Sequence, residues 1–271
     1  MQEIDEIYHD LCLKLIHGNK VGNTHELNNV QVTLNDITQN IVSIRGISPS
    51  YLFAEQLWYF TGRNDMRFIS TFGSMWERLS DDGVTNNSAY GYLMKHAFGF
   101  DQIEKMIELL RKDPNSRRAV INLNTPNEHV IETHDEPCTI CLQFLLRDGK
   151  LNCTTVMRSN DIWFGFPYDV AFFTELQMYI ADRLEVEYGT YTHFVMSMHL
   201  YDRNEDEIIK MLRKPISNQI VFDRHKFHHE KTFVAGLIDH AINHCSKEYT
   251  RELMLDLAKE HFGFKEISNE D

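Results

Sequence analysis

Apolar residues recur along the chain with two kinds of spacing, which together predict a protein of mixed helices and strands. Spacings of three and four residues predict amphipathic helices, over residues 1–17, 101–112 and 170–184. Continuous or alternating apolar runs predict strands, over residues 21–34, 119–123, 140–146, 151–157 and 195–201. Residues 204–271 are expected to form helices joined by charged loops. There is no internal repeat and no long linker, so we expect a single domain over residues 1–271.

A further helix is expected to begin at Pro49, because proline suits the first turn of a helix, and to continue through Phe60. Its one acidic residue, Glu55, has large apolar neighbours along the helix, namely Leu52, Phe53, Leu57, Trp58 and Phe60. A lone acid in such a helix usually lies on the solvated face, and we expect this of Glu55. Burial would instead raise its pKa toward the range that suits proton transfer.

Two of the predicted strands are joined through Asp148-Gly149, which is a strong hairpin signal. Cys138 stands just before the first of these strands, and Arg158 follows the second. Such a hairpin would carry a thiol and an anion-binding cation on one rigid platform. This arrangement suits a nucleophile site.

The pair Cys138-x-x-Cys141 allows three interpretations. A zinc site needs four ligands, but no second cysteine pair has matching spacing and the 14 histidines are scattered, so we expect no metal. A redox pair normally lies at the start of a helix, whereas these two cysteines lie on a predicted strand. Two buried cysteines that act as small hydrophobic residues are the third interpretation. Residues three apart on a strand face opposite sides, so we expect one thiol to face a cavity and the other to be packed.

Arg117 and Arg118 follow a turn at residues 113–115 and lead into a predicted strand. Together with Arg158, their forked guanidinium groups would suit a phosphate dianion. Taken alone, the two adjacent residues fit solvated loop arginines slightly better. The sequence pattern by itself leaves both interpretations open.

The composition excludes several classes of protein. A net charge of −13 argues against sequence-independent binding of nucleic acid, which requires a basic face, although a local arginine cluster still permits binding of a small anion. There is no Walker-type phosphate loop and no dinucleotide glycine fingerprint, so ATP and NAD are not indicated. Five cysteines, an acidic start and no apolar run of ~18 residues predict a cytosolic protein with free thiols.

Over residues 45–204 the order of short motifs resembles the thymidylate synthase superfamily. The matching segments, in chain order, are Ala54-Glu55-Gln56-Leu57-Trp58, Trp76, Ala89-Tyr90-Gly91, Asp101-Gln102, Pro114-Asn115-Ser116-Arg117-Arg118, Pro137-Cys138, Gln143-Phe144, Arg158-Ser159-Asn160-Asp161, Gly165-x-Pro167 and His199-Leu200-Tyr201. Each motif alone is weak, but ten in the same order are specific. The resemblance implies a three-layer α/β (α+β) fold with a twisted mixed sheet that forms the interface of a homodimer.

The same resemblance implies how a nucleotide would be attacked and held. Cys138 would be the thiolate that adds to C6 of a pyrimidine and makes C5 nucleophilic. Arg158 and Ser159 would bind the 5′-phosphate, together with two arginines from across the dimer, Arg117 and Arg118 of the partner subunit. Nearby cations also lower a thiol pKa, which the attack needs. The usual N-terminal phosphate arginine is not evident, and either of two residues could replace it, Lys20 or His25.

Further residues are assigned to the sugar, the folate and the proton transfers by this resemblance. The 3′-hydroxyl of the sugar would be held by two residues of the last motif, His199 and Tyr201. Asp161 would bond the pterin ring of a folate, and Trp76 would line the folate pocket. Water and proton transfers at C4 and C5 would be organised by Glu55 and Tyr90.

Asp169 departs from the synthases, which carry asparagine at this position. The asparagine amide accepts from N3–H of uracil and donates to O4, whereas cytosine offers an amino donor at N4 and an acceptor at N3. A carboxylate accepts from N4, and a proton shared between Asp169 and N3 makes the second contact. That proton also draws electrons from C6 and helps the thiol to attack. Uracil would leave one contact unmade, at a cost of ~1–3 kcal/mol, so we expect a cytosine nucleotide.

Other departures favour hydroxymethyl transfer over reductive methylation. The segment from Met157 to Asp161, followed by Phe164-Gly165-Phe166, resembles the deoxycytidylate hydroxymethylases of some bacterial viruses. Ser159 suits the members of that group that act on deoxynucleotides. The polar residues 264–271 have no counterpart of the apolar lid that excludes water before hydride transfer. A wetter site favours addition of hydroxide.

The expected activity is therefore 5-hydroxymethylation of deoxycytidylate (dCMP) with 5,10-methylenetetrahydrofolate as co-substrate, a step in making modified DNA. Three alternatives stay open: a dUMP hydroxymethylase or thymidylate synthase, a CMP hydroxymethylase, and a catalytically silent nucleotide- or RNA-binding regulator. The presence of Cys138 with Arg158, Tyr90 and Glu55 argues against the last. We expect a cytoplasmic homodimer, in the host cytoplasm if the protein is viral, with no membrane or direct nucleic-acid partner.

Overall fold

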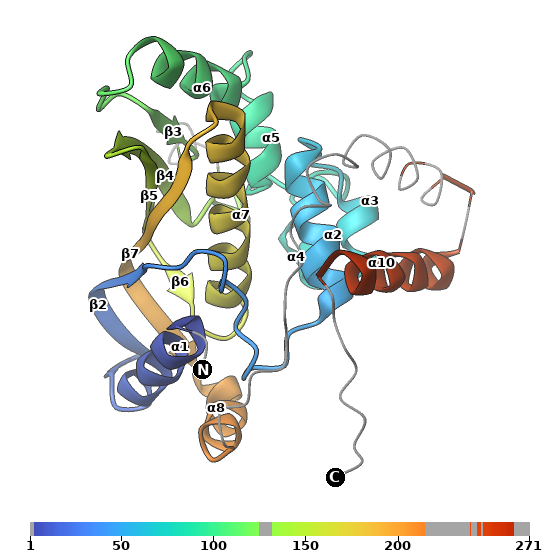
Figure 1. Cartoon of the computed structure of the whole chain (residues 1–271). Helices are drawn as coiled ribbons and strands as arrows, with labels where there is room; N and C mark the ends of the chain where they lie inside the picture. Colours follow the sequence, from blue (N-terminus) through green and yellow to red (C-terminus); the bar gives the residue numbers. More distant parts are fainter. Residues whose placement is uncertain (1–2, 125–131, 215–238, 240–242, 245, 263–271) are drawn as a thin grey trace. The chain divides into compact units, whose positions relative to one another are not determined.

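The computed structural model describes residues 3–124, 132–214, 239, 243–244 and 246–262 (Figure 1). The chain divides into two compact units. The sheet unit comprises residues 1–46, 101–125 and 138–218, and the helical unit comprises residues 47–100, 126–137 and 219–271. The expectation of a single domain over residues 1–271 stays a prediction.

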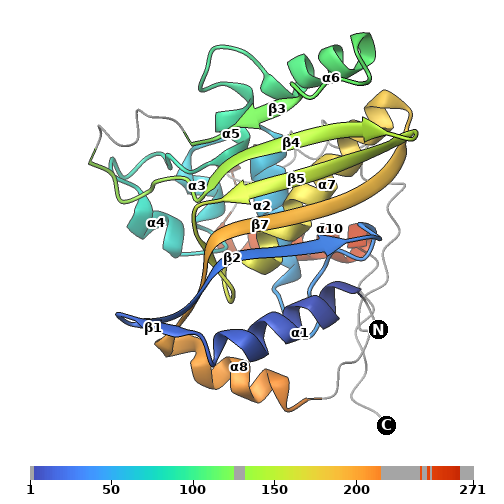
Figure 2. The ribbon, with the colours of Figure 1, turned by 90° about the vertical axis from the view of Figure 1, so that its left-hand side faces the viewer.

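The sheet unit is built on one seven-stranded mixed sheet with the order β1-β2-β7-β5-β4-β3, and β6 pairs with β7 off this path. The strands are β1 (Asn19–Val21), β2 (Thr24–Leu34), β3 (Val120–Asn122), β4 (Thr139–Arg147), β5 (Lys150–Met157), β6 (Asn160–Asp161) and β7 (Glu187–Tyr201). β7 runs parallel to β5 and β6, and the other pairs are antiparallel. Figure 2 shows the twist of the strands along the sheet. The expected α/β fold with a twisted mixed sheet is confirmed, and its use as a dimer interface stays a prediction.

The hairpin of β4 and β5 has the turn that the sequence predicts. Arg147 pairs with Lys150, and the two residues between them, Asp148 and Gly149, have φ angles of 51° and 76°. A two-residue turn in which both φ angles are positive twists in the same sense as the strands that it joins. Glycine and aspartate adopt positive φ more readily than most residues. The turn therefore sets the register of the two strands.

Helix α7 (Phe166–Leu184) packs against β5 and β7 and forms a large part of the core of the sheet unit (Figure 1). Fourteen of its nineteen residues are buried, so it is covered on more than one side. The helix begins at Phe166, earlier than the predicted start at residue 170, because Pro167 occupies the first turn, where its missing N–H costs nothing. As a result Asp169 lies in the first turn of α7 and not in the preceding loop.

Strand β7 is also longer than predicted, since it begins at Glu187 and not near Val195. Its burial alternates along most of its length, with Tyr191, His193 and Val195 fully buried. The apolar pattern fails to reveal the first half of the strand because histidine and threonine occupy many of its positions.

The other helices of the sheet unit are α1 (Glu3–Leu15), α6 (Gln102–Lys112) and α8 (Glu205–Leu212). Helix α6 packs against α7, where both guanidinium Nη atoms of Arg183 lie 2.8 Å from the two carboxyl oxygens of Glu104. Such a two-pronged ion pair fixes orientation as well as distance. It joins the end of α7 to the first turn of α6.

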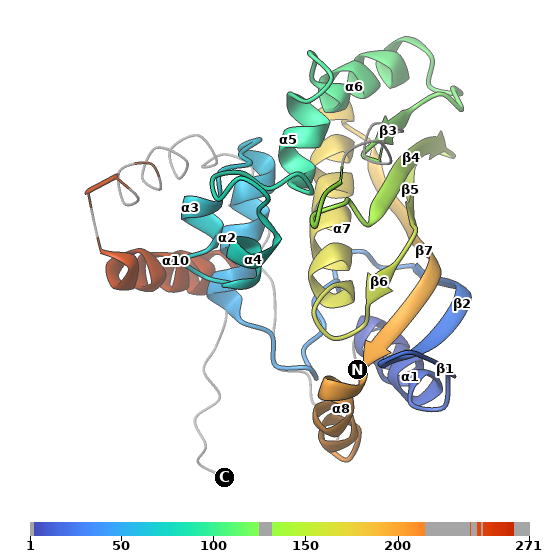
Figure 3. The same cartoon turned by 180° about the vertical axis from the view of Figure 1, so that it is seen from behind.

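The helical unit contains α2 (Pro49–Phe60), α3 (Met66–Ile69), α4 (Met75–Leu79), α5 (Tyr90–Lys95) and α10 (Lys247–Phe262) (Figure 3). Helix α2 begins at Pro49 as predicted, with Ser48 as its N-cap. Every residue from Leu52 to Phe60 is buried, because α5 and α10 both pack against α2. The expectation that Glu55 lies on a solvated face is therefore wrong, since the residue is only 6% exposed.

The helices expected over residues 204–271 are described only in part. α8 and α10 belong to that stretch, and the rest of it lies outside the described residues. In the part of the chain that the structure describes, no helix has the length and apolar character needed to cross a membrane.

Candidate active site

The predicted nucleophile and its nearest predicted cation lie at one end of the β4–β5 hairpin. The backbone N–H of Arg158, just after β5, donates to the carbonyl oxygen of Cys138, just before β4, at 2.9 Å. Both residues are half-buried. The hairpin therefore places Cys138 and Arg158 side by side on adjacent strand ends, on one platform as the sequence predicts.

The expectation that one of the two cysteines in the pair is packed away is wrong. Cys138 and Cys141 are both half-buried, and Thr139 is fully buried in their place. The reason is a bulge in β4, because the register of the hairpin shifts between Thr139 and Cys141 and the strict alternation of sides is lost there. Burial raises the pKa of the Cys141 thiol. All four cysteines in the described part of the chain are free.

Asp169 lies at the end of a chain of buried hydrogen bonds. The amide Nδ2 of Asn160 donates to Asp169 Oδ2 at 2.7 Å, and the amide Oδ1 of Asn160 lies 3.0 Å from His193 Nε2. The hydroxyl of Tyr191 lies 2.8 Å from Nδ1 of the same imidazole. Burial raises the pKa of Asp169 to about 7, aided by the negative charge of Asp161 and opposed by the bond from Asn160. The carboxyl group is therefore poised to exchange a proton near neutral pH.

Gly165 makes room for this arrangement at the start of α7. A Cβ atom at this position would lie 2.6 Å from Nδ2 of Asn160 and 2.9 Å from the carbonyl oxygen of Asp161. The same glycine carbonyl accepts the backbone N–H of Asp169 at 3.0 Å. Only a residue without a side chain allows the helix start and the Asn160 amide to approach this closely.

Asp161, the residue assigned to the folate, shapes the loop that precedes α7. Its Oδ1 atom accepts the backbone N–H of Trp163 at 2.8 Å. Burial raises the pKa of Asp161, whereas that hydrogen bond and the nearby His199 lower it. β6 holds Asp161 opposite His199 of β7. The role of Asp161 toward a folate stays a prediction.

The residues assigned to the phosphate and the sugar lie side by side at the end of β7. The hydroxyl of Ser159 is 3.3 Å from Nδ1 of His199. The rings of His199 and Tyr201 meet edge to face, with centroids 5.1 Å apart, and Arg203 lies 4.4 Å above the Tyr201 ring. The structure thus brings the Ser159 hydroxyl, the imidazole and the phenol together, as the sequence predicts.

Arg117 and Arg118 are exposed. The Nη2 atom of Arg118 is 3.5 Å from a carboxyl oxygen of Asp113, and the Arg117 carbonyl accepts from Gln143 Nε2 at 3.0 Å. Exposed side chains of this kind are free to reach another molecule. Their predicted action on the partner's nucleotide stays a prediction.

Lys20 and His25 could each replace the missing N-terminal arginine, but both lie against acids. Lys20 forms an ion pair with Asp202, and Nε2 of His25 is 3.8 Å from Asp202 and 3.7 Å from Glu205. Within the described residues, His25, Asp202 and Glu205 form one group whose ligand atoms are close enough to surround a metal ion. The Lys20 ammonium already balances the charge of Asp202. Neither side chain is therefore well placed to serve a phosphate.

Glu55 in the helical unit is held by a residue that the sequence analysis missed. The hydroxyl of Tyr51 donates to Oε1 of Glu55 at 2.8 Å, and the indole N–H of Trp76 donates to the Tyr51 hydroxyl at 3.0 Å. Trp76 is itself buried edge-on against Trp58, with centroids 4.9 Å apart. Tyr51 and Glu55 are four residues apart and therefore lie on one face of α2. This spacing is the sequence signal that could have revealed Tyr51.

Tyr90 is the first residue of α5 and is almost fully buried. Its ring stacks on that of Tyr59 with centroids 5.2 Å apart. The next residue, Gly91, lies against the backbone of α2, because a Cβ there would come within 1.9 Å of the Tyr59 carbonyl oxygen. This close approach fixes the start of α5, and with it the position of Tyr90 on α2.

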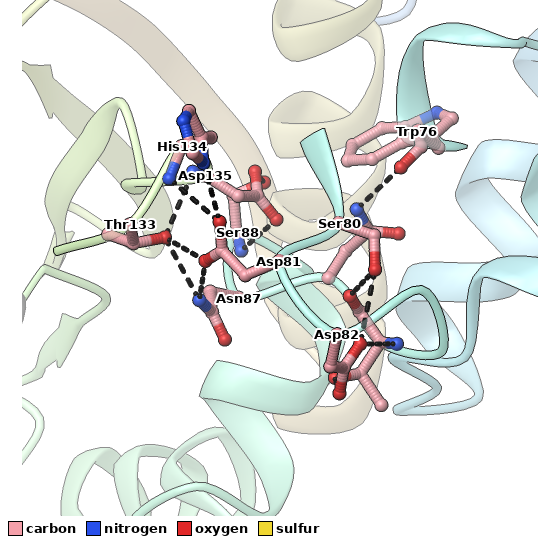
Figure 4. Close-up of polar contacts among 11 residues, drawn as sticks. Trp76, Ser80, Asp81, Asp82, Asn87, Ser88, Thr133, His134 and Asp135 are labelled. Atoms are coloured by element: carbon pink, nitrogen blue, oxygen red, sulfur yellow. Dashed lines mark hydrogen bonds and ion pairs between the residues drawn. The ribbon is translucent and has the colours of Figure 1, made fainter. Parts of the chain in front are cut away.

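The segment that leads into Cys138 is held by a network of acids that the sequence analysis did not detect (Figure 4). Asp81 accepts from the Thr133 hydroxyl at 2.6 Å and from the backbone N–H of His134 at 3.0 Å. The buried Asp135 accepts from both the backbone N–H and the hydroxyl of Ser88. Ser88 precedes Tyr90 by two residues, and Asp135 precedes Cys138 by three. The network therefore ties together the two chain segments that lead to these predicted site residues.

Arg45 is a further residue that sequence patterns did not reveal. Its guanidinium carbon lies 4.7 Å from the centroid of the Trp163 ring, and it is 5.5 Å from the rings of Phe164 and Tyr168. Contacts of this kind are attractive because the faces of aromatic rings are negative. Arg45 therefore braces the loop between Asp161 and α7.

The chain matches the protein family described as "Thymidylate synthase" over residues 14–239. It belongs to the thymidylate synthase family. Two similar proteins of this kind are both named "Deoxyuridylate hydroxymethyltransferase". One, from Bacillus phage SP01, is 34% identical over 170 residues, which are 58% of this chain and 44% of the relative. The other, from Pseudomonas phage M6, is 32% identical over 161 residues, which are 58% of this chain and 46% of the relative.

Membership in the thymidylate synthase family confirms the resemblance found in the sequence motifs, and the phage origin of the relatives agrees with it. The chain spans less than half the length of these two curated relatives. Their names specify hydroxymethyl transfer, as expected, but the base in the names is uracil. The narrower likeness to deoxycytidylate enzymes is therefore not supported by these two relatives.

Proposed function

We propose that this member of the thymidylate synthase family is a folate-dependent 5-hydroxymethyltransferase and that its substrate is dCMP. The products would be 5-hydroxymethyl-dCMP and tetrahydrofolate. Family membership and the names of the two phage relatives support hydroxymethyl transfer to a pyrimidine deoxynucleotide. The choice of cytosine rests on Asp169.

The observation that carries the choice of base is the half-buried carboxyl of Asp169, which accepts from the Asn160 amide at 2.7 Å. A carboxyl group whose pKa burial raises to about 7 can hold one proton near neutral pH. The protonated oxygen then donates to N3 of cytosine while the other oxygen accepts from N4–H. Asparagine cannot offer a proton to N3 together with an acceptor to N4–H unless its amide turns over. A bound base would shield this half-buried carboxyl group from water, which makes an unmade hydrogen bond costly.

The proposed reaction begins with addition of the Cys138 thiolate to C6, which makes C5 nucleophilic. The co-substrate 5,10-methylenetetrahydrofolate supplies the one-carbon unit that becomes attached to C5. The proton shared by Asp169 and N3 withdraws electrons from the ring and promotes the addition. Glu55, oriented by Tyr51, and Tyr90 would move protons at C4 and C5 and guide water. Loss of the C5 proton and departure of tetrahydrofolate would leave an exocyclic methylene on C5. Addition of water to that carbon and departure of the Cys138 thiolate from C6 would complete the reaction.

The nucleotide would be held by residues of two subunits. Arg158 and Ser159 would contact the 5′-phosphate, and His199 and Tyr201 the sugar. The 3.3 Å contact between Ser159 and His199 supports neighbouring phosphate and sugar sites. Exposed arginines supplied in trans, Arg117 and Arg118 of the partner subunit, would complete the phosphate site, so the proposal includes a homodimer.

Asp161 and Trp76 would hold the folate. Asp161 is half-buried and keeps its loop in place through the Trp163 N–H. A half-buried acid in an ordered loop suits the polar edge of a pterin ring. Trp76 is buried against Trp58 and its N–H is already used by Tyr51, so its assignment to the folate pocket rests on the family resemblance.

A second candidate substrate is dUMP, because both phage relatives carry deoxyuridylate in their names. A neutral carboxyl group also has one donor and one acceptor oxygen, so uracil could be matched if the proton sat on the other oxygen. A CMP hydroxymethylase is the remaining alternative, and Ser159 argues for the deoxynucleotide.

Tritium release from [5-³H]dCMP and [5-³H]dUMP in the presence of methylenetetrahydrofolate tests the proposal. We expect faster release from dCMP, formation of 5-hydroxymethyl-dCMP, and no rise in the near-ultraviolet absorbance of dihydrofolate. Cys138→Ala should abolish release, and Asp169→Asn should shift the preference toward dUMP. Faster release from dUMP by the wild-type protein would overturn the choice of base, and formation of dihydrofolate would overturn hydroxymethyl transfer.

A further inference from the structure

The chain of hydrogen bonds that ends at Asp169 continues into the core of the sheet unit. Asn160 is almost fully buried, and His193 and Tyr191 behind it are fully buried. His193 is also packed edge to face against Phe166, with centroids 5.2 Å apart. These three side chains have no assigned part in the reaction. Burial of three linked polar groups is costly unless each has a defined partner.

The partners define the direction of every hydrogen bond in this chain. Asn160 directs its Nδ2 at Asp169 and its Oδ1 at His193. A carbonyl oxygen only accepts, so His193 must carry a hydrogen on Nε2. Burial lowers the pKa of His193 to about 3, so the ring is neutral near neutral pH and its Nδ1 is an acceptor.

Tyr191 completes the deduction. Its hydroxyl is 2.8 Å from His193 Nδ1 and must donate, because Nδ1 has no hydrogen in this tautomer. Burial raises the pKa of Tyr191 well above its ordinary value, so the phenol keeps its proton. All donation therefore runs one way, from Tyr191 through His193 and Asn160 to Oδ2 of Asp169.

We propose that Tyr191, His193 and Asn160 are positioning residues that fix which oxygen of Asp169 carries its proton, and that they thereby set the base preference of the reaction. This inference rests on the proposed function. Oδ2 accepts from Asn160, so a proton on the neutral acid resides on Oδ1. With Oδ1 toward N3, the acid donates to cytosine, while Oδ2 has a second lone pair for N4–H. The N3–H group of uracil would meet another donor.

The reverse direction would remove the preference for cytosine. If the Asn160 amide were turned over, Oδ2–H would donate to it, the amide would donate to His193 Nε2, and the hydrogen would reside on Nδ1. Oδ1 of Asp169 would then be an acceptor, which does not match the acceptor N3 of cytosine. The tautomer of His193 therefore shows in which direction the hydrogen bonds donate, and it can be measured without substrate.

The test combines a spectroscopic and a kinetic measurement on the full-length protein. Long-range ¹H–¹⁵N spectra of protein labelled in its histidines give the tautomer of His193, with His193→Gln to identify the signal. Tritium release from dCMP and dUMP gives the ratio of kcat/KM values for wild type, Tyr191→Phe and Asn160→Ala. Tyr188→Phe is the matched control, because Tyr188 is an exposed tyrosine at the start of β7 whose hydroxyl donates to Asp182 of α7.

We expect a hydrogen on Nε2 of His193 in the wild-type protein. We also expect the preference for dCMP to fall about tenfold in Tyr191→Phe and more in Asn160→Ala, with the control unchanged. A hydrogen on Nδ1, or an unchanged preference in a folded Tyr191→Phe protein, would overturn this inference and leave the proposed function standing. If the wild-type protein turned over neither nucleotide, the proposed function would be overturned. The role of these hydrogen bonds in choosing a base would then be overturned as well.

Discussion

Tyr51 donates its hydroxyl proton to Glu55 across 2.8 Å from one turn earlier on the same face of α2. The indole N–H of Trp76 donates to the Tyr51 hydroxyl, so the phenolic proton is directed at the carboxyl group. Glu55 is only 6% exposed, and a buried acid needs hydrogen-bond partners with a defined geometry. Tyr51 therefore orients the carboxyl group that the proposed reaction uses for proton transfer.

Tyr51→Phe is expected to lower turnover by about fivefold, since it removes one hydrogen bond of ~1 kcal/mol from a catalytic carboxyl group. Tritium release from the 5-position of the nucleotide measures the effect. Tyr249→Phe is the matched control, because Tyr249 lies on α10 and is 53% exposed. Equal turnover in the two variants would show that Tyr51 has no part in orienting Glu55.

Ser88→Ala is expected to destabilise the protein by about 1–3 kcal/mol, because it leaves one oxygen of the buried Asp135 without the Ser88 hydroxyl. Urea unfolding gives the free energy. Ser74→Ala, at an exposed serine that precedes α4, is the control and should change it by less than ~0.5 kcal/mol. A similar loss in both variants would contradict the role of Asp135 in holding the segment that leads to Cys138.

The free energy of unfolding of Asp169→Asn, relative to that of the wild type, is expected to increase as the pH rises. Burial raises the pKa of folded Asp169 to about 7, compared with ~3.9 in an unfolded chain. Between these values the folded protein keeps a proton that the unfolded chain has lost, so the stability of the wild type falls with increasing pH. The asparagine variant has no such loss and still accepts the hydrogen bond from Asn160.

Unfolding free energies at about pH 4 and about pH 8 test this prediction. The difference in unfolding free energy between the variant and the wild type should increase by about 2–4 kcal/mol over that range, because each pKa unit corresponds to about 1.36 kcal/mol. Asp206→Asn, at an exposed position of α8, is the control for a lost surface charge. A gap that is constant between the two pH values would rule out a raised pKa for Asp169.

Gly165→Ala is expected to reduce turnover by at least tenfold and to cost about 1–3 kcal/mol of stability through overpacking. Its methyl group would come within 2.6 Å of the Asn160 amide and 2.9 Å of the Asp161 carbonyl oxygen. Gly83→Ala is the control, because its methyl group would meet nothing within 4 Å and only its positive φ would cause strain. Tritium release and urea unfolding distinguish the two. Unimpaired turnover in Gly165→Ala would show that Asn160 tolerates displacement.

The sequence alone predicted the elements whose signals are local. Asp148-Gly149 predicted the central hairpin, because both residues accept the positive φ of a two-residue turn. Pro49 predicted the start of α2, because proline is suited to the first helical turn. The order of motifs around Cys138 and Arg158 also predicted the family, which the match over residues 14–239 confirms.

Only the tertiary structure decided which polar side chains are buried and what they contact. Glu55 was expected in solvent, but α5 and α10 pack against α2 and Glu55 is only 6% exposed, and no pattern within the helix encodes those neighbours. Cys138 and Cys141 were expected on opposite sides, and the bulge in β4 removed that alternation. Asn160 of β6 lies nine residues before Asp169, but His193, which contacts the Asn160 amide, comes from the more distant β7. The bonds that orient the Asp169 carboxyl group therefore exist only once β6 and β7 have paired.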